Sequence, residues 1–253
     1  MSDGARGRLI ALAAILAAIL ALGWWVFDGS TTWPRTIRSR LTIVVETPEG
    51  ERSGSSVTQG TTIFTGGMTK DLGFGIRGKL VGEGVAVDLG PRGFLVATFE
   101  TQFALSRGGM ASYNPALVPF PQAKFRGNYY KGMSDNDELA AYLDEVNRLK
   151  PRGELPFQDL PVLVRFHDPK DPTSVELVDP QNLAASFGPG VTLKHAFVEI
   201  TDDPVTKGIE SQLPWLTSSN VSPSLFPPHQ GLRSNAETPA VENLRYDDFR
   251  RLP

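Results

Sequence analysis

The 253-residue chain has no cysteine, few histidines and no surplus of basic residues. Without cysteine there are no disulfides, no thiolate chemistry and no cysteine-based zinc site. None of the three histidines, His167, His195 and His229, lies within four residues of another. The net charge is −3 and the isoelectric point is near 5.7, whereas a nucleic-acid-binding protein normally shows a basic surplus or a clustered basic face. The composition therefore predicts no nucleic-acid partner.

The longest uncharged stretch covers residues 9–27, LIALAAILAAILALGWWVF. A membrane-spanning helix needs about 20 apolar residues, and Trp24 and Trp25 fall at the edge of the stretch, where such rings favour the membrane interface. Arg6 and Arg8 precede it, which favours an N-terminus inside the cell. These features predict a single-pass protein of the inner membrane, with the membrane as a partner and the globular region in the periplasm. A cleaved signal peptide ending near 21–23 is the alternative, but the usual apolar core is only about 7–15 residues long.

The expected fold class is α+β, with an N-terminal transmembrane helix followed by a β-rich globular region that has a few short helices. Ser, Pro and Asn dominate the end of the chain, where periodicity vanishes, so a disordered tail is expected there. The expected division is a short N-terminal tail (1–8), the transmembrane helix (9–27), a juxtamembrane linker (28–40), the globular region (41–216) and the tail (217–253). Within the globular region we expect a β-rich part (41–109), an irregular loop (110–133), a helix (134–150) and a ββαβα part (160–216).

Individual elements follow from local patterns. β-branched residues predict strands at 41–46, 51–58, 79–89 and 93–99. Apolar residues at helical spacing predict a helix that begins at Ser134 and ends before Pro151. Further along, strands are expected at 162–166, 174–178 and 191–200. Two more helices are expected to begin at Asp179-Pro180 and Asp203-Pro204, because Asp accepts a bond at a helix N-cap and Pro at the first position loses none.

Three motifs were considered as sites, and none is predicted to be one. Residues 73–78, GFGIRG, match G-x-G-x-x-G, but a dinucleotide site needs a helix after it, and a strand is expected there. The serines at 53, 55 and 56 form no G-x-S-x-G elbow. His167 with Asp168, Asp171 and Asp179 offers metal ligands, although Asp beside Pro is also typical of turns. No catalytic residue, metal ligand, cofactor or dinucleotide is therefore expected.

Two segments resemble a family of uncharacterised, mainly alphaproteobacterial proteins. They are RLTIVVETPEGERSGSSV at 40–57 and residues 160–216, which include VELVDPQNLAASFGPGV and EITDDPVTKGIESQLPWL. The resemblance implies a single-pass, membrane-anchored chain with no assigned activity. It supplies no catalytic residues.

The sequence favours a non-enzymatic envelope protein that binds or organises a partner, such as another envelope protein, at the membrane. The reason is that a membrane anchor is expected, whereas no catalytic or cofactor-binding site is. The alternative is a membrane-tethered hydrolase with an acidic site, since hydrolysis needs two carboxylates about 5–10 Å apart and Asp202, Asp203 and Glu210 lie near one another in the sequence.

Overall fold

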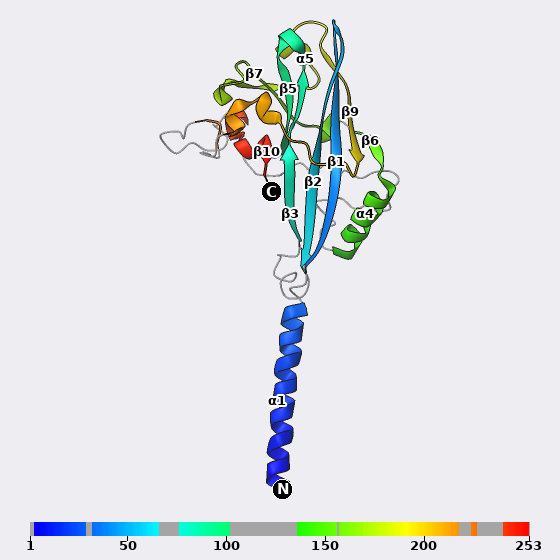
Figure 1. The fold of residues 1–253 in the computed structure, drawn as a ribbon, viewed down its shortest axis with the longest axis vertical. Coiled ribbons are helices and arrows are strands. Elements are labelled where there is room, and N and C mark those ends of the chain that lie inside the picture. Colours follow the sequence, from blue (N-terminus) through cyan, green and yellow to red (C-terminus); the bar gives the residue numbers. More distant parts are fainter. Residues whose placement is uncertain are drawn as a thin grey trace.

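Antiparallel β-sheets are the main secondary structure of the chain (Figure 1), which a computed structural model describes over residues 3–28, 32–65, 76–101, 136–155, 157–217, 224–226 and 240–252. Helices are few in these ranges. The α+β class is therefore corrected to a mainly antiparallel β fold. Long-range strand pairing, which a local pattern does not reveal, is the physical reason for the difference.

The larger sheet has six strands and is built around a long hairpin. β1 and β2 pair along their whole length through the turn at Thr47 and Gly50. Gly50 has a φ of 115°, which an L side chain rarely adopts, and the Thr47 hydroxyl donates to the Gly50 carbonyl at 2.7 Å. The strand order is β10 (Arg250–Arg251), β3 (Ile76–Glu83), β2 (Gly50–Thr65), β1 (Thr32–Thr47), β9 (Thr192–Ile200) and β6 (Arg152–Glu154).

The smaller sheet has four strands, in the order β4 (Val85–Asp88), β5 (Phe94–Thr101), β7 (Pro161–Phe166) and β8 (Val175–Val178). The single strand expected at 79–89 is wrong, because the chain passes from one sheet to the other at Gly84. A Cβ at Gly84 would lie 2.5 Å from the Ala97 carbonyl oxygen. Its N–H donates to the Phe249 carbonyl at 2.9 Å, so the crossing point is also where the C-terminal segment attaches.

The main core lies where the hairpin, the smaller sheet and helix α4 (Asn136–Leu149) pack together. Ile43, Val45 and Val146 are fully buried there. The helical spacing predicted for this segment is confirmed, except that Leu149 is 37% exposed. The expected start at Ser134 lies outside the described residues, as does the loop at 110–133.

The starting residues predicted for the two helices at Asp-Pro pairs are both wrong. α5 (Leu183–Phe187) has Asn182 at its N-cap without a side-chain cap, because the Asp179 carboxylate accepts instead from the Gln181 N–H, at 2.8 Å, in a turn. After Asp203 no helix begins; the next helical turn is at Ile209–Ser211. Asp203 forms an ion pair with Arg40 instead.

The described residues on both sides of the expected globular region form regular structure. The segment expected as a linker at 28–40 is strand from Thr32 onward. Residues 240–252, expected to be disordered, form two 3₁₀ turns (Ala240–Asn243 and Tyr246–Asp248) and β10. Leu244 and Phe249 are fully buried in a second cluster with Val164 and Phe166. Apolar residues spaced too widely for a helix or strand pattern thus still hold the segment in place.

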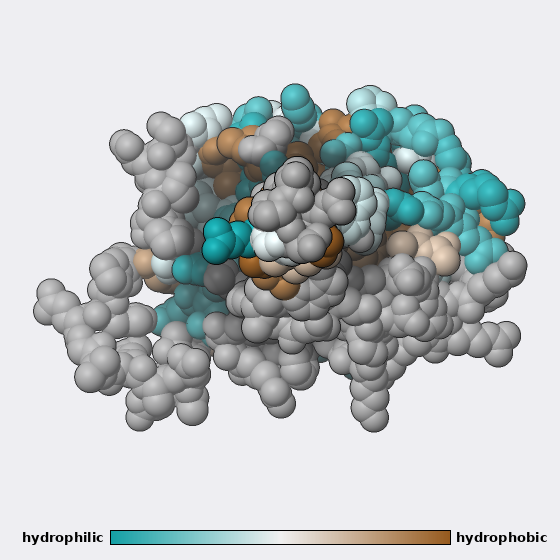
Figure 2. Space-filling view, turned by 90° about the horizontal axis from the view of Figure 1, so that it is seen from below, coloured by the Kyte–Doolittle hydropathy of each residue, from teal (hydrophilic) through white to brown (hydrophobic). Residues whose placement is uncertain are grey.

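Helix α1 (Asp3–Asp28) extends away from the sheets in Figure 1 and includes most of the expected N-terminal tail. Figure 2 shows the molecule from below, so that α1 is seen end-on, with apolar side chains (brown) around it. The transmembrane helix expected at 9–27 is corrected: among the helices in the described ranges, none has the length and hydropathy needed to cross a membrane. The run did predict a helix, because Ala and Leu favour helix formation wherever they lie, and helix formation is a separate property from spanning a bilayer.

Candidate functional site

A groove of about 740 Å³ lies on the face of β1, β2 and β3. Its floor contains side chains that the strand register places side by side, Arg38 opposite Gln59 and Gln59 opposite Val81. The segment after β9 and the strand β10 line it as well. The lining residues are Arg38, Gln59, Thr61, Lys79, Val81, Gly82, Glu83, Pro204, Val205, Thr206, Lys207, Arg250, Arg251 and Leu252.

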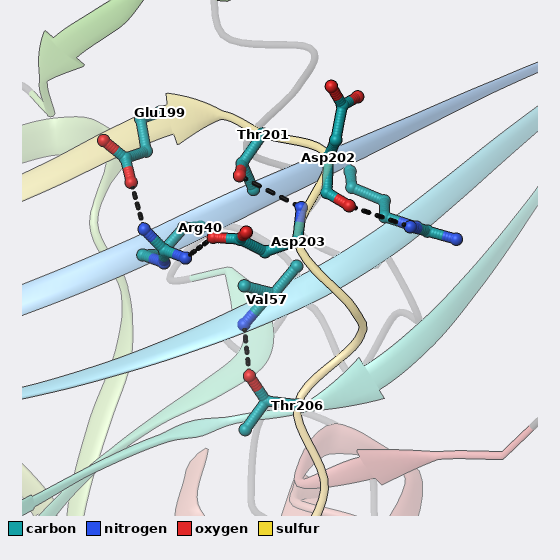
Figure 3. Close-up of polar contacts among 8 residues, drawn as sticks. Arg40, Val57, Glu199, Thr201, Asp202, Asp203 and Thr206 are labelled. Carbon is teal, nitrogen blue, oxygen red and sulfur yellow. Dashed lines mark hydrogen bonds and ion pairs between the residues drawn. The ribbon is translucent and has the colours of Figure 1, made fainter.

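One side of the groove is formed by residues 204–207, which cross the hairpin after β9 (Figure 3). Arg40 on β1 fixes the start of this crossing by pairing with Glu199, at 2.5 Å, and with Asp203. Thr206 then binds the edge of β2 twice: its N–H donates to the Val57 carbonyl at 3.0 Å, and its hydroxyl accepts from the Val57 N–H at 2.8 Å. The segment is thus held like an added strand, which brings Lys207 to the groove.

The other side is formed by β10, where Arg250 pairs with Glu83 of β3 in the strand register. Glu83 is only 3% exposed, and its carboxylate accepts from the Ile209 N–H at 2.9 Å. The Arg250 guanidinium lies 3.3 Å from Glu83 and 3.8 Å from Glu210. Because unpaired charges are costly to bury, this interaction fixes Arg250 and with it the position of β10.

The turn that precedes β10 contains a buried carboxyl group. Asp248 is 2% exposed, and burial raises the pKa of its carboxyl group, against the lowering effect of hydrogen bonds from the Arg245 N–H and the Glu100 side chain. Arg251 lies 4.0 Å from the Asp248 carboxylate and over the ring of Phe99. The turn before β10 is therefore packed around a carboxyl group whose pKa lies above its usual range.

The groove is strongly cationic. Among the residues that the structure describes, five basic side chains line it, against a single carboxylate, Glu83, which already faces Arg250. Among the described residues, Arg38 donates to neutral acceptors, the Gln59 side chain and the Asp202 carbonyl, each at 3.1 Å. Lys79 and Lys207 are exposed, and neither forms an ion pair with any residue that the structure describes. Three positive charges are thus left without a counter-charge.

The acidic residues considered for hydrolysis are each neutralised by a different cation. Asp202 pairs with Lys150, Asp203 with Arg40 and Glu210 with Arg250. General acid–base work needs carboxylates held across a substrate space, and these three instead fasten the 201–210 segment to the body of the protein. Their role in the described structure is architectural.

The residues considered for metal binding form a turn. The Asp168 carboxylate accepts from the Lys170 N–H, and the Asp171 carboxylate from the Thr173 N–H, both at 2.9 Å. Hydrogen bonds donated by the Thr173 hydroxyl and by the Thr173 N–H lower the pKa of Asp171. His167 pairs with Glu176 at 2.8 Å. Within the described ranges, no three His, Asp or Glu side chains are placed to hold a metal ion together.

The remaining motif residues lie apart from the groove or outside the described ranges. Ser53 and Ser55 are exposed on β2, and Ser56 is buried with its hydroxyl donating to the Glu83 carbonyl at 2.7 Å. Residues 73–75 of the glycine-rich match are not among those described. β3 begins directly after them, at Ile76, in agreement with the strand expected there.

The groove itself was missed at the sequence level. Its cations come from β1, β3, the 204–207 segment and β10, so no local stretch of sequence is unusually basic. Arg250 and Arg251 also fall in the segment expected to be disordered. The adjacent pair at 250–251 is the one local signal, and only the fold places it in the same groove lining as Lys79.

Comparisons with protein-family models, curated proteins and solved structures find no match to the chain. The resemblance of 40–57 and 160–216 to alphaproteobacterial membrane-anchored proteins therefore stays a prediction. The groove is interpreted from its own geometry.

Proposed function

We propose that the chain is a membrane-associated binding module of the cell envelope, which binds an anionic ligand in the cationic groove. The observation that carries the proposal is the set of five basic side chains around a space with one carboxylate. A cleft lined by charges of one sign concentrates ions of the opposite sign. The volume also falls within the range of about 300–1,000 Å³ that is typical of small-molecule sites.

Helix α1 supports the association with lipid. Eight of its large apolar side chains are between 57% and 75% exposed: Ile10, Leu12, Ile15, Leu16, Ile19, Leu20, Leu22 and Trp24. A helix that is apolar on every side is normally covered by protein or lipid. Nothing in the described body covers these side chains, so lipid contact accounts for them.

An acidic hydrolase is a weaker proposal. Asp202, Asp203 and Glu210 each pair with a cation of the protein body, whereas acid–base hydrolysis needs two carboxylates held across a substrate space.

Flotation on neutral phosphatidylcholine vesicles tests the lipid association of the full chain without involving the cationic groove. We expect the parent protein to float and Ile15→Asp/Ile19→Asp to remain in the dense fraction, because each variant side chain places a charge among the apolar ones. Gln181→Asp/Asn182→Asp is the matched control, since it adds the same charge at exposed positions next to α5. A parent protein that fails to float, or an α1 variant that floats equally well, would contradict the proposal.

A further inference from the structure

We infer that the groove recognises a phosphate-bearing ligand with at least two negative charges, and that Lys79, Lys207 and Arg38 bind it. The inference rests on the proposed function for the groove as the ligand site. It adds the chemical class of the ligand and the residues that contact it.

The charge balance of the groove sets the charge of the ligand. Arg250 and Arg251 lie near Glu83, Glu210 and Asp248 and form part of the fixed wall. Lys79, Lys207 and Arg38 have no such carboxylate among the described residues. A ligand with a single negative charge would leave most of this positive charge uncompensated, whereas a phosphate ester or a diphosphate supplies about two charges or more.

The directions from which the donors come favour tetrahedral oxygens over planar ones. The two lysines and the arginine belong to β3, the 204–207 segment and β1, so they reach the groove from its floor and its side. A carboxylate is planar and is matched best by the fork of one arginine, while lysine acts as a point charge that suits phosphate. Two lysines and one arginine from three segments therefore fit oxygen atoms that point in several directions.

Neutral groups of the lining can complete the binding of phosphate oxygens. The Thr206 hydroxyl accepts from the Val57 N–H, which leaves its own proton to donate. The Gln59 side-chain oxygen accepts from Arg38, which leaves the amide N–H₂ as a donor. Because these donors are already oriented by protein contacts, a bound anion would gain hydrogen bonds without first ordering the side chains.

The closing experiment is a calorimetric titration of the full chain, held in neutral detergent micelles, with inorganic pyrophosphate. We expect saturable binding to the parent protein. The double variant Lys79→Gln/Lys207→Gln should bind at least about tenfold more weakly, because each lysine removed takes away a charge-assisted contact. Lys170→Gln is the matched control: it removes an exposed lysine from the turn at 168–171, outside the groove lining, and should bind like the parent.

Two further ligands separate the outcomes. Succinate, a dicarboxylate, should bind much more weakly than pyrophosphate; equal binding that depends on Lys79 and Lys207 would overturn the phosphate assignment and leave the anion-binding function standing. Binding of neither anion would overturn both. Dihexanoyl phosphatidate, a soluble lipid, shows the source of the phosphate: tighter binding than pyrophosphate indicates a lipid headgroup, weaker binding a free phosphate compound, and either result supports the inference.

Discussion

Arg40 illustrates how charged side chains are used in this protein. It lies between Glu199 and Asp203 and joins β1 to the segment that crosses the hairpin (Figure 3). Most carboxylates near this segment are paired in the same way, for example Asp202 with Lys150. Lys79 and Lys207 of the groove differ, since they form no ion pair with any residue that the structure describes. The paired residues therefore position the segments around the groove, and the two lysines are available to bind a ligand.

Asp203→Ala is expected to lower the free energy of unfolding by less than about 1 kcal/mol, the usual range for exposed ion pairs, since the Asp203 side chain is 51% exposed. The loss should disappear in an Arg40→Ala background, because the partner is already gone. Urea unfolding of the two single variants and the double variant measures the coupling. A loss that persists without Arg40 would contradict the ion pair and favour a cap or turn role for Asp203.

Asp248→Asn tests the buried carboxyl group. Burial raises the pKa of Asp248, so the folded protein keeps the proton at pH values where the unfolded chain has released it. Stability from this group is complete below the unfolded pKa of about 3.9 and is lost as the pH rises through the higher folded pKa. Asn resembles the protonated form and can still accept from the Arg245 N–H, so the variant should lack this loss.

The measurement is the free energy of unfolding of the parent protein and Asp248→Asn at several pH values from acid to neutral. The parent should lose stability relative to the variant as the pH rises. Glu100, Asp247 and Arg251 also face this carboxyl group and are present in both proteins, so the difference between the two profiles isolates Asp248. Parallel profiles would show that folding does not raise the pKa of Asp248.

At the level of elements, Gly54 allows the two sheets to approach each other closely. A Cβ at Gly54 on β2 would lie 2.2 Å from the carbonyl oxygen of Ala86 on β4, a backbone atom that cannot move aside. Gly54→Ala is therefore expected to lower the free energy of unfolding by about 1–3 kcal/mol, as overpacking does. Gly78→Ala on β3 is the control, because a Cβ there meets nothing within 4 Å. Thermal melts in which both variants behave alike would contradict this packing.

The C-terminal segment is held by an aromatic cluster. Trp215 lies 5.5 Å from Phe166, 5.1 Å from Tyr246 and 5.4 Å from Phe249, measured between ring centroids. Phe249 is fully buried, so Phe249→Ala should cost about 3–5 kcal/mol. Limited proteolysis should then cut the 240–252 segment faster in the variant. Equal cleavage of parent and variant would favour the disordered tail expected from composition.

Local patterns predicted the elements that depend on local physics. The β1–β2 hairpin, the buried face of α4 and the strands β7 and β9 follow from alternation, helical spacing and turn residues. The break at Gly84 and the docking of 240–252 depend on contacts between distant segments, which no window of sequence contains. The groove belongs to the second kind, because only the strand order β10-β3-β2-β1 brings Arg38 and Arg250 into the lining of one groove.

At the scale of the whole molecule, an apolar helix and a cationic groove lie on the same chain. Figure 1 shows α1 below the sheets and β10 on the body above it. β1 connects the two regions, since it begins at Thr32 on the side of α1 and carries Arg38 into the groove.

Locating a bound anion tests the central claim most directly. The measurement is an experimental structure of the full chain with pyrophosphate, determined alongside Lys79→Gln/Lys207→Gln under the same conditions. We predict pyrophosphate in the groove of the parent protein, within hydrogen-bond distance of Lys79, Lys207 and Arg38, and none there in the variant. Pyrophosphate bound elsewhere, or an empty groove in a parent protein saturated with ligand, would contradict the account.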